Sequence, residues 1–300
     1  MAVQTIAILM PGDMGHGCAI TFRENGFRVV TNLTGRSERT CGLSAKAEIE
    51  DLGSFEEVAR QSDLVLSILP PENALEQARV FADAMLAAGT KPSYVDCNAI
   101  APATAEEVGA EIARAGAPFT DGGIIGRNPV AENGGTRLYV SGPDTAPVRE
   151  LDGRGIVVRD IGEGIGRASG LKMVYASATK GTFSLHAAVL TTAHAMGLTD
   201  DYIKELTESQ PAMLAAMERM IPRIPLDAAR WEGEMREIAA TFAAAAVTPK
   251  FHEGSGDMMA LADRTPISAE TRETVDTDRT LIQVLDMYVA ARSPAKDVAG

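Results

Sequence analysis

The amino-acid sequence predicts an α/β protein, with a doubly wound, mostly parallel sheet in its N-terminal half and an all-α C-terminal domain. Three observations support this fold class. Short apolar runs alternate with segments of helical period up to residue 160. A turn that contains glycines directly follows the first run. Beyond residue 166 no strand pattern appears.

The apolar runs of the N-terminal half have the length and composition of strands. They lie at residues 5–10, 27–32, 64–69, 93–98, 118–123, 137–142 and 155–160. Helical segments, such as residues 71–88 and 102–115, separate several of them. Strands that alternate with helices indicate βαβ units and a mostly parallel sheet. Because the runs are nearly continuous in apolar residues, we expect helices on both faces of this sheet.

The composition changes at residues 162–166, which read GEGIG and are typical of a loop. After this loop, helices are expected at residues 167–197 and at about residues 199–220, 226–246 and 267–292. Prolines separate several of these segments, although Pro211 also suits the first turn of a helix. We therefore expect a doubly wound domain over residues 1–163 and an all-helical domain over residues 164–300.

The overall composition excludes several classes of function. The chain of 300 residues carries a formal net charge of -13. A nucleic-acid partner needs a basic surface, so none is expected. A small anionic substrate remains compatible, because a single pocket can be basic on an acidic protein. The apolar run near the N-terminus is too short for a signal segment or a membrane span, so no membrane partner is expected.

The cysteines and histidines predict neither disulfides nor a metal site. Three widely spaced cysteines, at positions 18, 41 and 97, indicate a protein of the reducing cytoplasm. His186, His194 and His252 lack the spacing of metal ligands.

The turn after the first predicted strand has the pattern of a dinucleotide-binding site. Met10, Gly12 and Gly15 occupy the three glycine positions of the fingerprint GxGxxG. In that fingerprint the glycines let the backbone approach a pyrophosphate at a helix N-terminus. A strand precedes the turn, and a helix and a second strand follow it, which is the Rossmann arrangement. The residues expected to contact the cofactor here are Gly12, Asp13, Met14 and Gly15.

The end of the second predicted strand bears on the choice between NADP and NAD. An acidic side chain there would hold the ribose 2′-hydroxyl of NAD, but residues 31–37 contain none. Guanidinium groups pair well with phosphate, so this loop can hold the 2′-phosphate of NADP instead. The candidate residues are Thr34, Arg36, Ser37 and Arg39. NADP is therefore favoured and NAD remains possible; in the alternative, these arginines are only solvated loop residues.

Two further strand ends are placed to contact the cofactor, because ligands of open α/β sheets lie beyond the carboxyl ends of the strands. Leu69 and Pro70 end one predicted strand and Asn98 follows another. Cys97, beside Asn98, is more typical of a packed residue than of a nucleophile.

The helix expected from residue 167 carries the candidate catalytic groups. Lys172 lies among apolar neighbours, and Tyr175 and Thr179 share its helical face. Partial desolvation at a cleft lowers the pKa of a lysine and would let Lys172 exchange a proton with a substrate hydroxyl or carbonyl. Tyr175 would hydrogen-bond the same oxygen. Lys180 would either bind an anionic substrate or extend into solvent. Extension into solvent is also the alternative to a catalytic role for Lys172.

Four motifs together resemble those of the β-hydroxyacid dehydrogenase superfamily, which includes 3-hydroxyisobutyrate dehydrogenase and 6-phosphogluconate dehydrogenase. They are the glycine turn, residues 95–102 (VDCNAIAP), residues 121–126 (DGGIIG) and residues 166–172 (GRASGLK). The chain is especially similar to a less-characterised branch of 6-phosphogluconate dehydrogenase-like oxidoreductases with its own C-terminal helical domain. The resemblance implies that Lys172 is the general acid/base. It also implies that Gly122, Gly123 and Ile124 line the substrate pocket, and that the helical domain forms a homodimer.

Two positions depart from the superfamily pattern. Ile125 replaces a serine of the substrate motif, and Tyr175 replaces an asparagine after the catalytic lysine. Both departures affect the groups that hold the substrate, so they leave its identity open while the type of reaction is retained.

The sequence thus predicts an NAD(P)-dependent oxidoreductase with a small-molecule substrate, a hydroxy acid or its oxo partner. An imine reductase on the same fold and an NADP-binding regulator without turnover are the alternatives. Lys172 counts against an imine reductase, because related imine reductases typically have Asp or Tyr at its position. The presence of this catalytic lysine also argues against a regulator without turnover.

Overall fold

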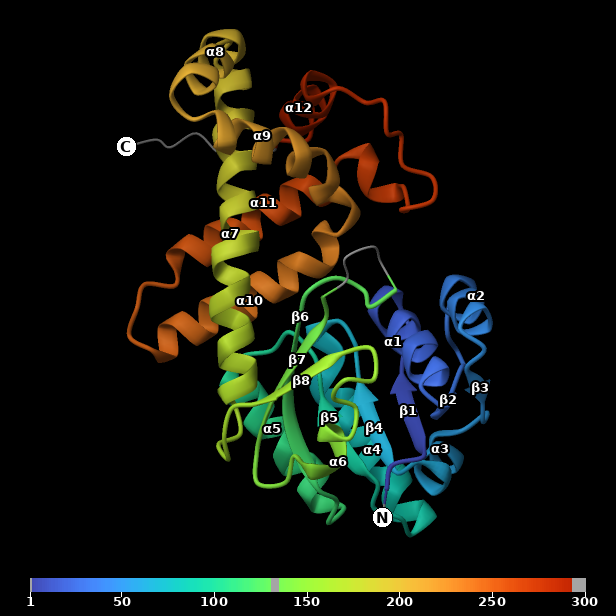
Figure 1. The fold of residues 1–300 in the computed structure, drawn as a ribbon. Helices are drawn as coiled ribbons and strands as arrows, with labels where there is room; N and C mark the ends of the chain where they lie inside the picture. The colour runs from blue at the N-terminus through green and yellow to red at the C-terminus, as the bar shows by residue number, and fades with distance from the viewer. Residues whose placement is uncertain (1, 131–134, 293–300) are drawn as a thin grey trace. The chain divides into compact units, whose positions relative to one another are not determined.

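The computed structural model describes residues 2–130 and 135–292 (Figure 1). The chain divides into two compact units, Met1–Val174 and Tyr175–Gly300. The boundary between the units falls inside helix α7 (Arg167–Ala195). The domain boundary predicted at residues 163 and 164 remains a proposal.

The first unit is built on an eight-stranded sheet, which confirms the predicted α/β class. Its strands are β1 (Thr5–Leu9), β2 (Arg28–Thr31), β3 (Glu50–Asp51), β4 (Leu64–Ser67), β5 (Ser93–Asp96), β6 (Phe119–Ile125), β7 (Arg137–Ser141) and β8 (Val157–Asp160). The order in the sheet is β3-β2-β1-β4-β5-β6-β7-β8. Neighbouring strands are parallel except β6 and β7, which are antiparallel.

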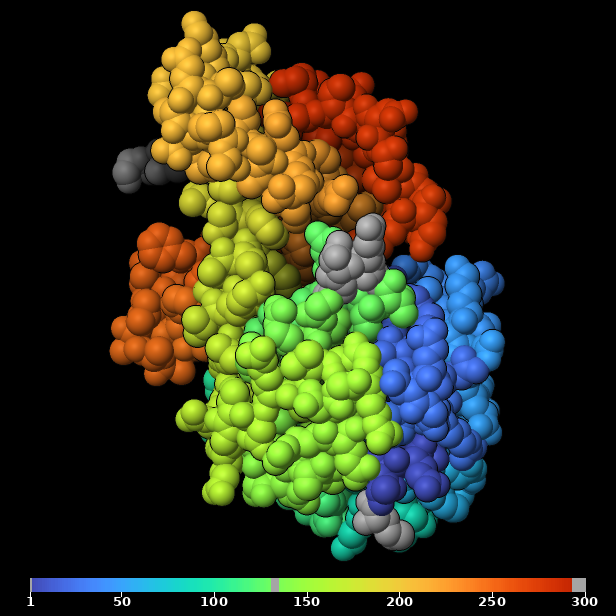
Figure 2. Space-filling model, viewed as in Figure 1, coloured from blue at the N-terminus to red at the C-terminus, as the bar shows by residue number. Residues whose placement is uncertain are grey.

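Helices cover both faces of this sheet, as the apolar strands predict. They are α1 (Asp13–Glu24), α2 (Glu38–Lys46), α3 (Phe55–Gln61), the 3-10 turn η1 (Pro71–Asn73), α4 (Ala74–Ala88), α5 (Pro102–Arg114) and α6 (Ala146–Arg149). Alternate residues of β1 enter different cores: Ala7 packs with α3, α4 and α5, whereas Ile8 packs with α1 and α6. On the face of the first unit seen in Figure 2, the yellow-green segment of β7 and β8 lies beside the blue segment of α1. The guanidinium of Arg154 lies over the ring of Phe27.

The second unit is helical over its described residues, as predicted. It contains the rest of α7 followed by α8 (Thr199–Ser209), α9 (Pro211–Met220), the 3-10 turn η2 (Ile221–Leu226), α10 (Ala228–Ala244), α11 (Lys250–Asp263), the 3-10 turn η3 (Pro266–Ala269) and α12 (Leu281–Ala290). Pro211 lies in the first turn of α9, as its sequence position allows. Along the described part of the chain, no helix has both the length and the apolar character needed to cross a membrane.

Two details of the helical unit differ from the sequence prediction. Helix α11 lies outside the predicted segments, because Gly254 and Gly256 lower the helix propensity of its sequence. The helix forms nonetheless because it packs on α10, where Gly256 lies against Met235. The single helix predicted over residues 267–292 is wrong in its first half. Residues 271–280 are irregular because Thr and Asp side chains bond the local backbone there, as Thr274 Oγ1 does by accepting from the N–H of Thr271 at 2.8 Å.

Candidate active site

The glycine turn has the backbone of a dinucleotide site despite its unusual first residue. Met10 has a φ of 58°, in the left-handed region that glycine occupies at little cost. The N–H of Gly12 donates to the carbonyl of Met10 at 2.8 Å, which closes the turn. The methionine therefore adopts the conformation of the glycine it replaces, at a cost of about 1–2 kcal/mol.

The other two glycines of the turn have the roles that pyrophosphate binding requires. A Cβ at Gly12, the N-cap of α1, would meet no atom within 4 Å. Open space therefore lies beside the first N–H groups of the helix, where an anion is stabilised. A Cβ at Gly15 would lie 3.1 Å from Cγ2 of Ile8, so this glycine lets α1 pack closely on β1. The turn therefore fits a dinucleotide phosphate.

Asp13 and Arg39 are joined beside this turn. Nη2 of Arg39 lies 2.6 Å from Oδ1 of Asp13, and both side chains are partly exposed. Asn128, from the loop after β6, donates its amide to the Asp13 carbonyl at 2.5 Å. The guanidinium offsets a carboxylate that would otherwise repel a bound phosphate.

In the loop after β2, the guanidinium of Arg36 has a hydrogen-bond donor without a partner among the described residues. Its Nη2 donates to Oε1 of Gln77 on α4 at 3.2 Å, whereas its buried Nε has no hydrogen-bond partner among the described residues. Burial lowers the pKa of this guanidinium without removing its charge. The neighbouring hydroxyls are used locally: Ser37 caps α2 through the N–H of Thr40, and Thr34 donates to the carbonyl of Gly53.

Asn98 ties together the ends of β4 and β5. It is buried, and its Nδ2 donates to Oγ of Ser67 at 3.0 Å and to Oδ2 of Asp96 at 2.7 Å. Its Oδ1 accepts from the N–H of Leu69 at 2.5 Å. The side chain thus fixes the strand ends at which Leu69 and Pro70 lie. Contact of these three residues with the cofactor stays a prediction.

Asp121 holds the N-terminus of α7, a role that the sequence analysis missed. It is a buried residue of β6, and its Oδ2 accepts from the N–H groups of Ala168 at 2.9 Å and Ser169 at 3.1 Å. The hydroxyls of Ser141 and Ser169 also donate to it. A carboxylate at a helix N-terminus satisfies its orphan N–H groups and its positive dipole. The only sequence signal was the position of Asp121 at the start of the motif DGGIIG.

Lys172 lies at the carboxyl ends of β5 and β6 because glycines of β6 allow a close approach. A Cβ at Gly123 would lie 2.8 Å from the carbonyl oxygen of Ala168 and 3.1 Å from Cβ of Lys172. At Gly122 it would lie 2.6 Å from the carbonyl oxygen of Asp96. Lys172 is half-buried, and its Nζ donates to the carbonyl of Cys97 at 3.2 Å. Substrate contact by Gly122, Gly123 and Ile124 stays a prediction.

The remaining predicted site residues belong to the second unit. The Tyr175 side chain is 48% exposed. Lys180 forms an ion pair with Glu234, which is 2% exposed, and its Nζ lies 5.4 Å from the ring centre of Trp231. Arg230 also pairs with Glu234, so two cations compensate one buried carboxylate. Their roles toward the substrate stay predictions. Within the described ranges, no three His, Cys, Asp or Glu side chains gather as metal ligands would.

The fold and the glycine turn define a protein that binds a nicotinamide dinucleotide. Residues 5–150 match the family described as the NAD binding domain of 6-phosphogluconate dehydrogenase. Residues 193–261 match a family described as a domain of unknown function, DUF1932. These matches and the four motifs are those of the β-hydroxyacid dehydrogenase superfamily.

Three proteins are similar to this chain in sequence or in fold. An uncharacterised 28.5 kDa protein of Methanothermus fervidus is 28% identical over 189 residues, which are 63% of this chain and 71% of that protein. A conserved protein of unknown function, described as structurally similar to 3-hydroxyacid dehydrogenases, is 26% identical with a TM-score of 0.61, covering 86% of this chain and 98% of that one. The 3-hydroxyisobutyrate dehydrogenase of Mycobacterium tuberculosis shares the fold at 20% identity, with a TM-score of 0.63 and coverage of 87% and 93%.

Proposed function

We propose that the protein is an NADP-preferring dehydrogenase or reductase that interconverts a small hydroxy acid and its oxo partner, with Lys172 as general acid/base. The observation that carries this proposal is the placement of the Lys172 ammonium on the carbonyl of Cys97, at the carboxyl ends of the parallel strands. Ligands of open α/β sheets bind beyond these ends. Asp121 and Gly123 fix the helix that carries this lysine.

A nicotinamide cofactor, when bound at the glycine turn, would supply the hydride acceptor or donor. In oxidation, the substrate C–H bond breaks as a hydride, the O–H bond breaks as a proton, and a C=O bond forms. The neutral amine of Lys172 takes that proton. In reduction, the Lys172 ammonium returns the proton to the carbonyl oxygen. The carbonyl of Cys97 orients the lysine but cannot take its proton, so the residue can serve both directions.

The preference for NADP rests on Arg36. Its Nε is a buried donor with no hydrogen-bond partner among the described residues, and its charge suits a phosphate better than a hydroxyl. The residue that follows β2 is Asn32, not an acid. Arg39 contributes by compensating Asp13. NAD remains a possible second cofactor.

The substrate class rests on the superfamily and on the cations of the site. Hydroxy acids carry a carboxylate, which a cation of the protein would hold. Lys172 is the one lysine in residues 167–174, the part of α7 that belongs to the first unit, so a second lysine for the carboxylate would come from elsewhere. Tyr175 and Lys180 are the proposed contributions of the second unit, Tyr175 in place of the superfamily asparagine. The three free cysteines are consistent with a protein that functions in a reducing cytoplasm.

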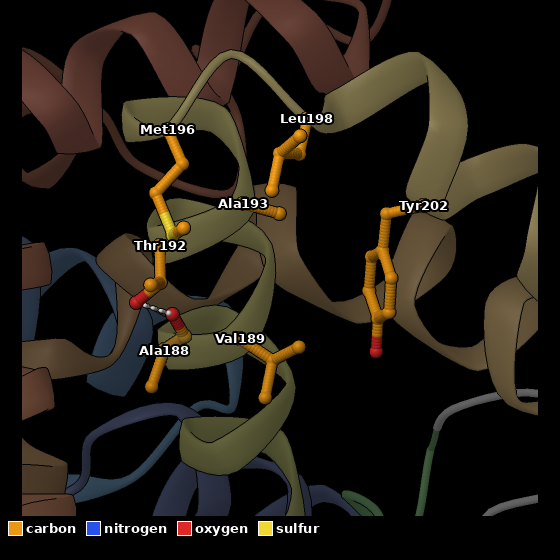
Figure 3. Close-up of a pocket in the computed structure, with 7 residues that line it drawn as sticks. All are labelled: Ala188, Val189, Thr192, Ala193, Met196, Leu198 and Tyr202. Atoms are coloured by element: carbon orange, nitrogen blue, oxygen red, sulfur yellow. Dashed lines mark hydrogen bonds between the residues drawn. The ribbon is translucent and has the colours of Figure 1, made fainter.

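Exposed apolar side chains on the second unit support the proposal that the protein forms a homodimer. Leu185 of α7 and Met196, directly after its end, are 61% and 65% exposed, and Leu185 shares a helical face with Val189. The adjoining hollow has a volume of about 350 Å³. Figure 3 shows the residues that line it: Ala188, Val189, Thr192, Ala193, Met196, Leu198 and Tyr202. A second copy would remove this apolar surface from water. Light scattering should give a dimer for the wild type and a monomer for Leu185→Asp; a wild-type monomer would contradict this proposal.

A panel assay that follows NADPH absorbance tests the reaction class. Small hydroxy acids, oxo acids, ketones with amines, and preformed imines are supplied with NADP(H) and NAD(H). Turnover of a hydroxy acid or oxo acid supports the proposal. Turnover of imines alone would make the protein an imine reductase. Tight NADPH binding with no turnover of any substrate would make it a regulator.

A further inference from the structure

A buried carboxyl that the proposed reaction does not use belongs to Asp96, the residue before Cys97, whose carbonyl accepts a hydrogen bond from the catalytic lysine. Asp96 ends β5, is 0% exposed, and pairs in register with Ser67 of β4 and Asp121 of β6. Its position places it on the central strands of the sheet, at the edge where the cofactor and substrate are proposed to bind. Carboxyl groups are seldom fully buried unless they have a task or a partner.

Two neutral amide groups hold this carboxyl in place. Oδ1 of Asp96 accepts from the backbone N–H of Asn98 at 2.9 Å, and Oδ2 accepts from Nδ2 of Asn98 at 2.7 Å. Asn98 is itself fixed by Ser67 and Leu69. Burial raises the pKa of Asp96 to about 7, although these hydrogen bonds act in the opposite direction. Both charge states of the carboxyl are therefore populated near neutral pH.

Asp96 and Lys172 are electrostatically coupled. The positive charge of Lys172 lowers the pKa of Asp96, and the ammonium is anchored on the carbonyl of Cys97, the next residue of the chain. Coupling between two ionisable groups is reciprocal. The carboxylate of Asp96 therefore favours the charged form of Lys172 by as much as the ammonium favours the carboxylate.

We propose that Asp96 is a positioning residue that acts through Lys172, because its buried carboxyl sets the charge that the catalytic ammonium faces. With Asp96 ionised, Lys172 retains its proton and is ready to donate it to a carbonyl. With Asp96 neutral, Lys172 loses its proton more readily and is ready to accept one from a hydroxyl. The catalytic consequence rests on the proposed function, whereas the coupling itself does not.

Other titratable groups face Asp96, and the negative charge of Asp121 raises the pKa of Asp96 by more than the charge of Lys172 lowers it. Asp121, from β6, is held by the first N–H groups of α7. Burial keeps the pKa of the Tyr94 hydroxyl and of the Cys97 thiol well above their usual values, so both stay neutral near pH 7. The neighbouring strand β4 contributes only the uncharged Ser67.

The coupling is tested by titrating Lys172 directly, without a substrate. Acetic anhydride acetylates only the neutral amine, so the extent of Lys172 acetylation against pH, measured by peptide mass spectrometry, gives its midpoint. In Asp96→Asn this midpoint should fall by at least about one pH unit. The matched control is Asp63→Asn, because Asp63 also accepts backbone N–H groups but lies at the amino end of β1. An unchanged midpoint in Asp96→Asn would overturn the proposal.

A reciprocal measurement covers the case in which Asp96→Asn does not fold. Carbon-13 NMR of the aspartate carboxyls should show Asp96 titrating near pH 7 in the wild type. In Lys172→Gln, which alters a half-buried side chain, this titration should move to higher pH. An Asp96 midpoint that is the same in both proteins would contradict the coupling.

Kinetics separate this inference from the proposed reaction. If a substrate is found, the lysine limb of the pH profile of kcat/KM should move to lower pH in Asp96→Asn, for oxidation and reduction alike. A shifted acetylation midpoint without turnover of any substrate would leave the coupling intact and reject the proposed function. Lysine-dependent turnover with an unmoved limb would reject the role of Asp96 and leave the function intact.

Discussion

The carboxylate of Asp121 accepts hydrogen bonds from both the backbone N–H and the hydroxyl of Ser169, at 3.1 and 2.5 Å. These contacts join β6 to the first turn of α7, the helix that carries Lys172. The placement of the proposed catalytic group therefore depends on a buried acid at some distance along the chain.

Replacing this acid should weaken both the fold and the site. Asp121→Asn keeps the shape but loses the charge and part of the bonding at the helix N-terminus, so the free energy of unfolding should fall by about 1–3 kcal/mol. Denaturant unfolding measures the change. Ser169→Ala, which removes one donor only, should cost about 1 kcal/mol. Equal stability of Asp121→Asn and the wild type would contradict the role given to Asp121.

The open space at Gly12 predicts a loss of cofactor binding without a loss of stability. A Cβ there meets no protein atom, but it would stand where the pyrophosphate approaches α1. The Kd of Gly12→Ala for NADPH should rise at least about tenfold, or about 1.4 kcal/mol. Calorimetry measures the Kd and thermal unfolding the stability. Gly254→Ala, on α11 and equally free of contacts, should leave the Kd unchanged.

Arg36 should discriminate between the two nicotinamide cofactors. Arg36→Ala removes the guanidinium proposed to hold the 2′-phosphate, so the Kd for NADPH should rise about ten- to hundredfold, as loss of a charge-assisted hydrogen bond predicts. The Kd for NADH should stay the same within error. Arg114→Ala, which removes an exposed ion pair with Asp83, serves as the control. A similar loss for both cofactors would refute the 2′-phosphate assignment.

The helical unit should lose stability in acid through its buried histidines. His252 is 7% exposed, its ring lies 4.4 Å from that of Phe242, and burial lowers its pKa below 6.5, as it does for His186. A lowered folded-state pKa gives stability that is present above pH 6.5 and is lost as pH falls below it, because the unfolded chain takes up the proton first. Thermal unfolding at pH 8 and pH 5.5 should show a smaller acid loss for His252→Asn than for the wild type. Equal losses would exclude His252 as a cause.

The sequence was informative where the physical signal is local. Continuous apolar runs predicted seven of the strands, and β3 escaped because it has only two residues, Glu50 and Asp51. The glycine turn predicted the Rossmann arrangement of β1, α1 and β2, but the left-handed backbone of Met10 could be seen only in the structure.

The contacts around Lys172 were beyond prediction because they join residues distant in the chain. The carbonyl of Cys97 lies 75 positions from the lysine that donates to it. Asp121 and Asp96 belong to two of the superfamily-like motifs, but neither motif states that Asp121 caps α7 or that the carboxyl of Asp96 is fully buried. The local uses of Ser37 and Asn98 likewise depend on neighbours that spacing does not identify.

The most direct test of the proposed function is the steady-state kinetics of Lys172→Ala with the best substrate of the panel. We expect kcat to fall at least about 10²-fold, because a general acid/base is lost, while the Kd for NADPH stays the same. Lys204→Ala, on an exposed position of α8, controls for the loss of a lysine and should retain full activity. An unchanged kcat in Lys172→Ala would contradict the account.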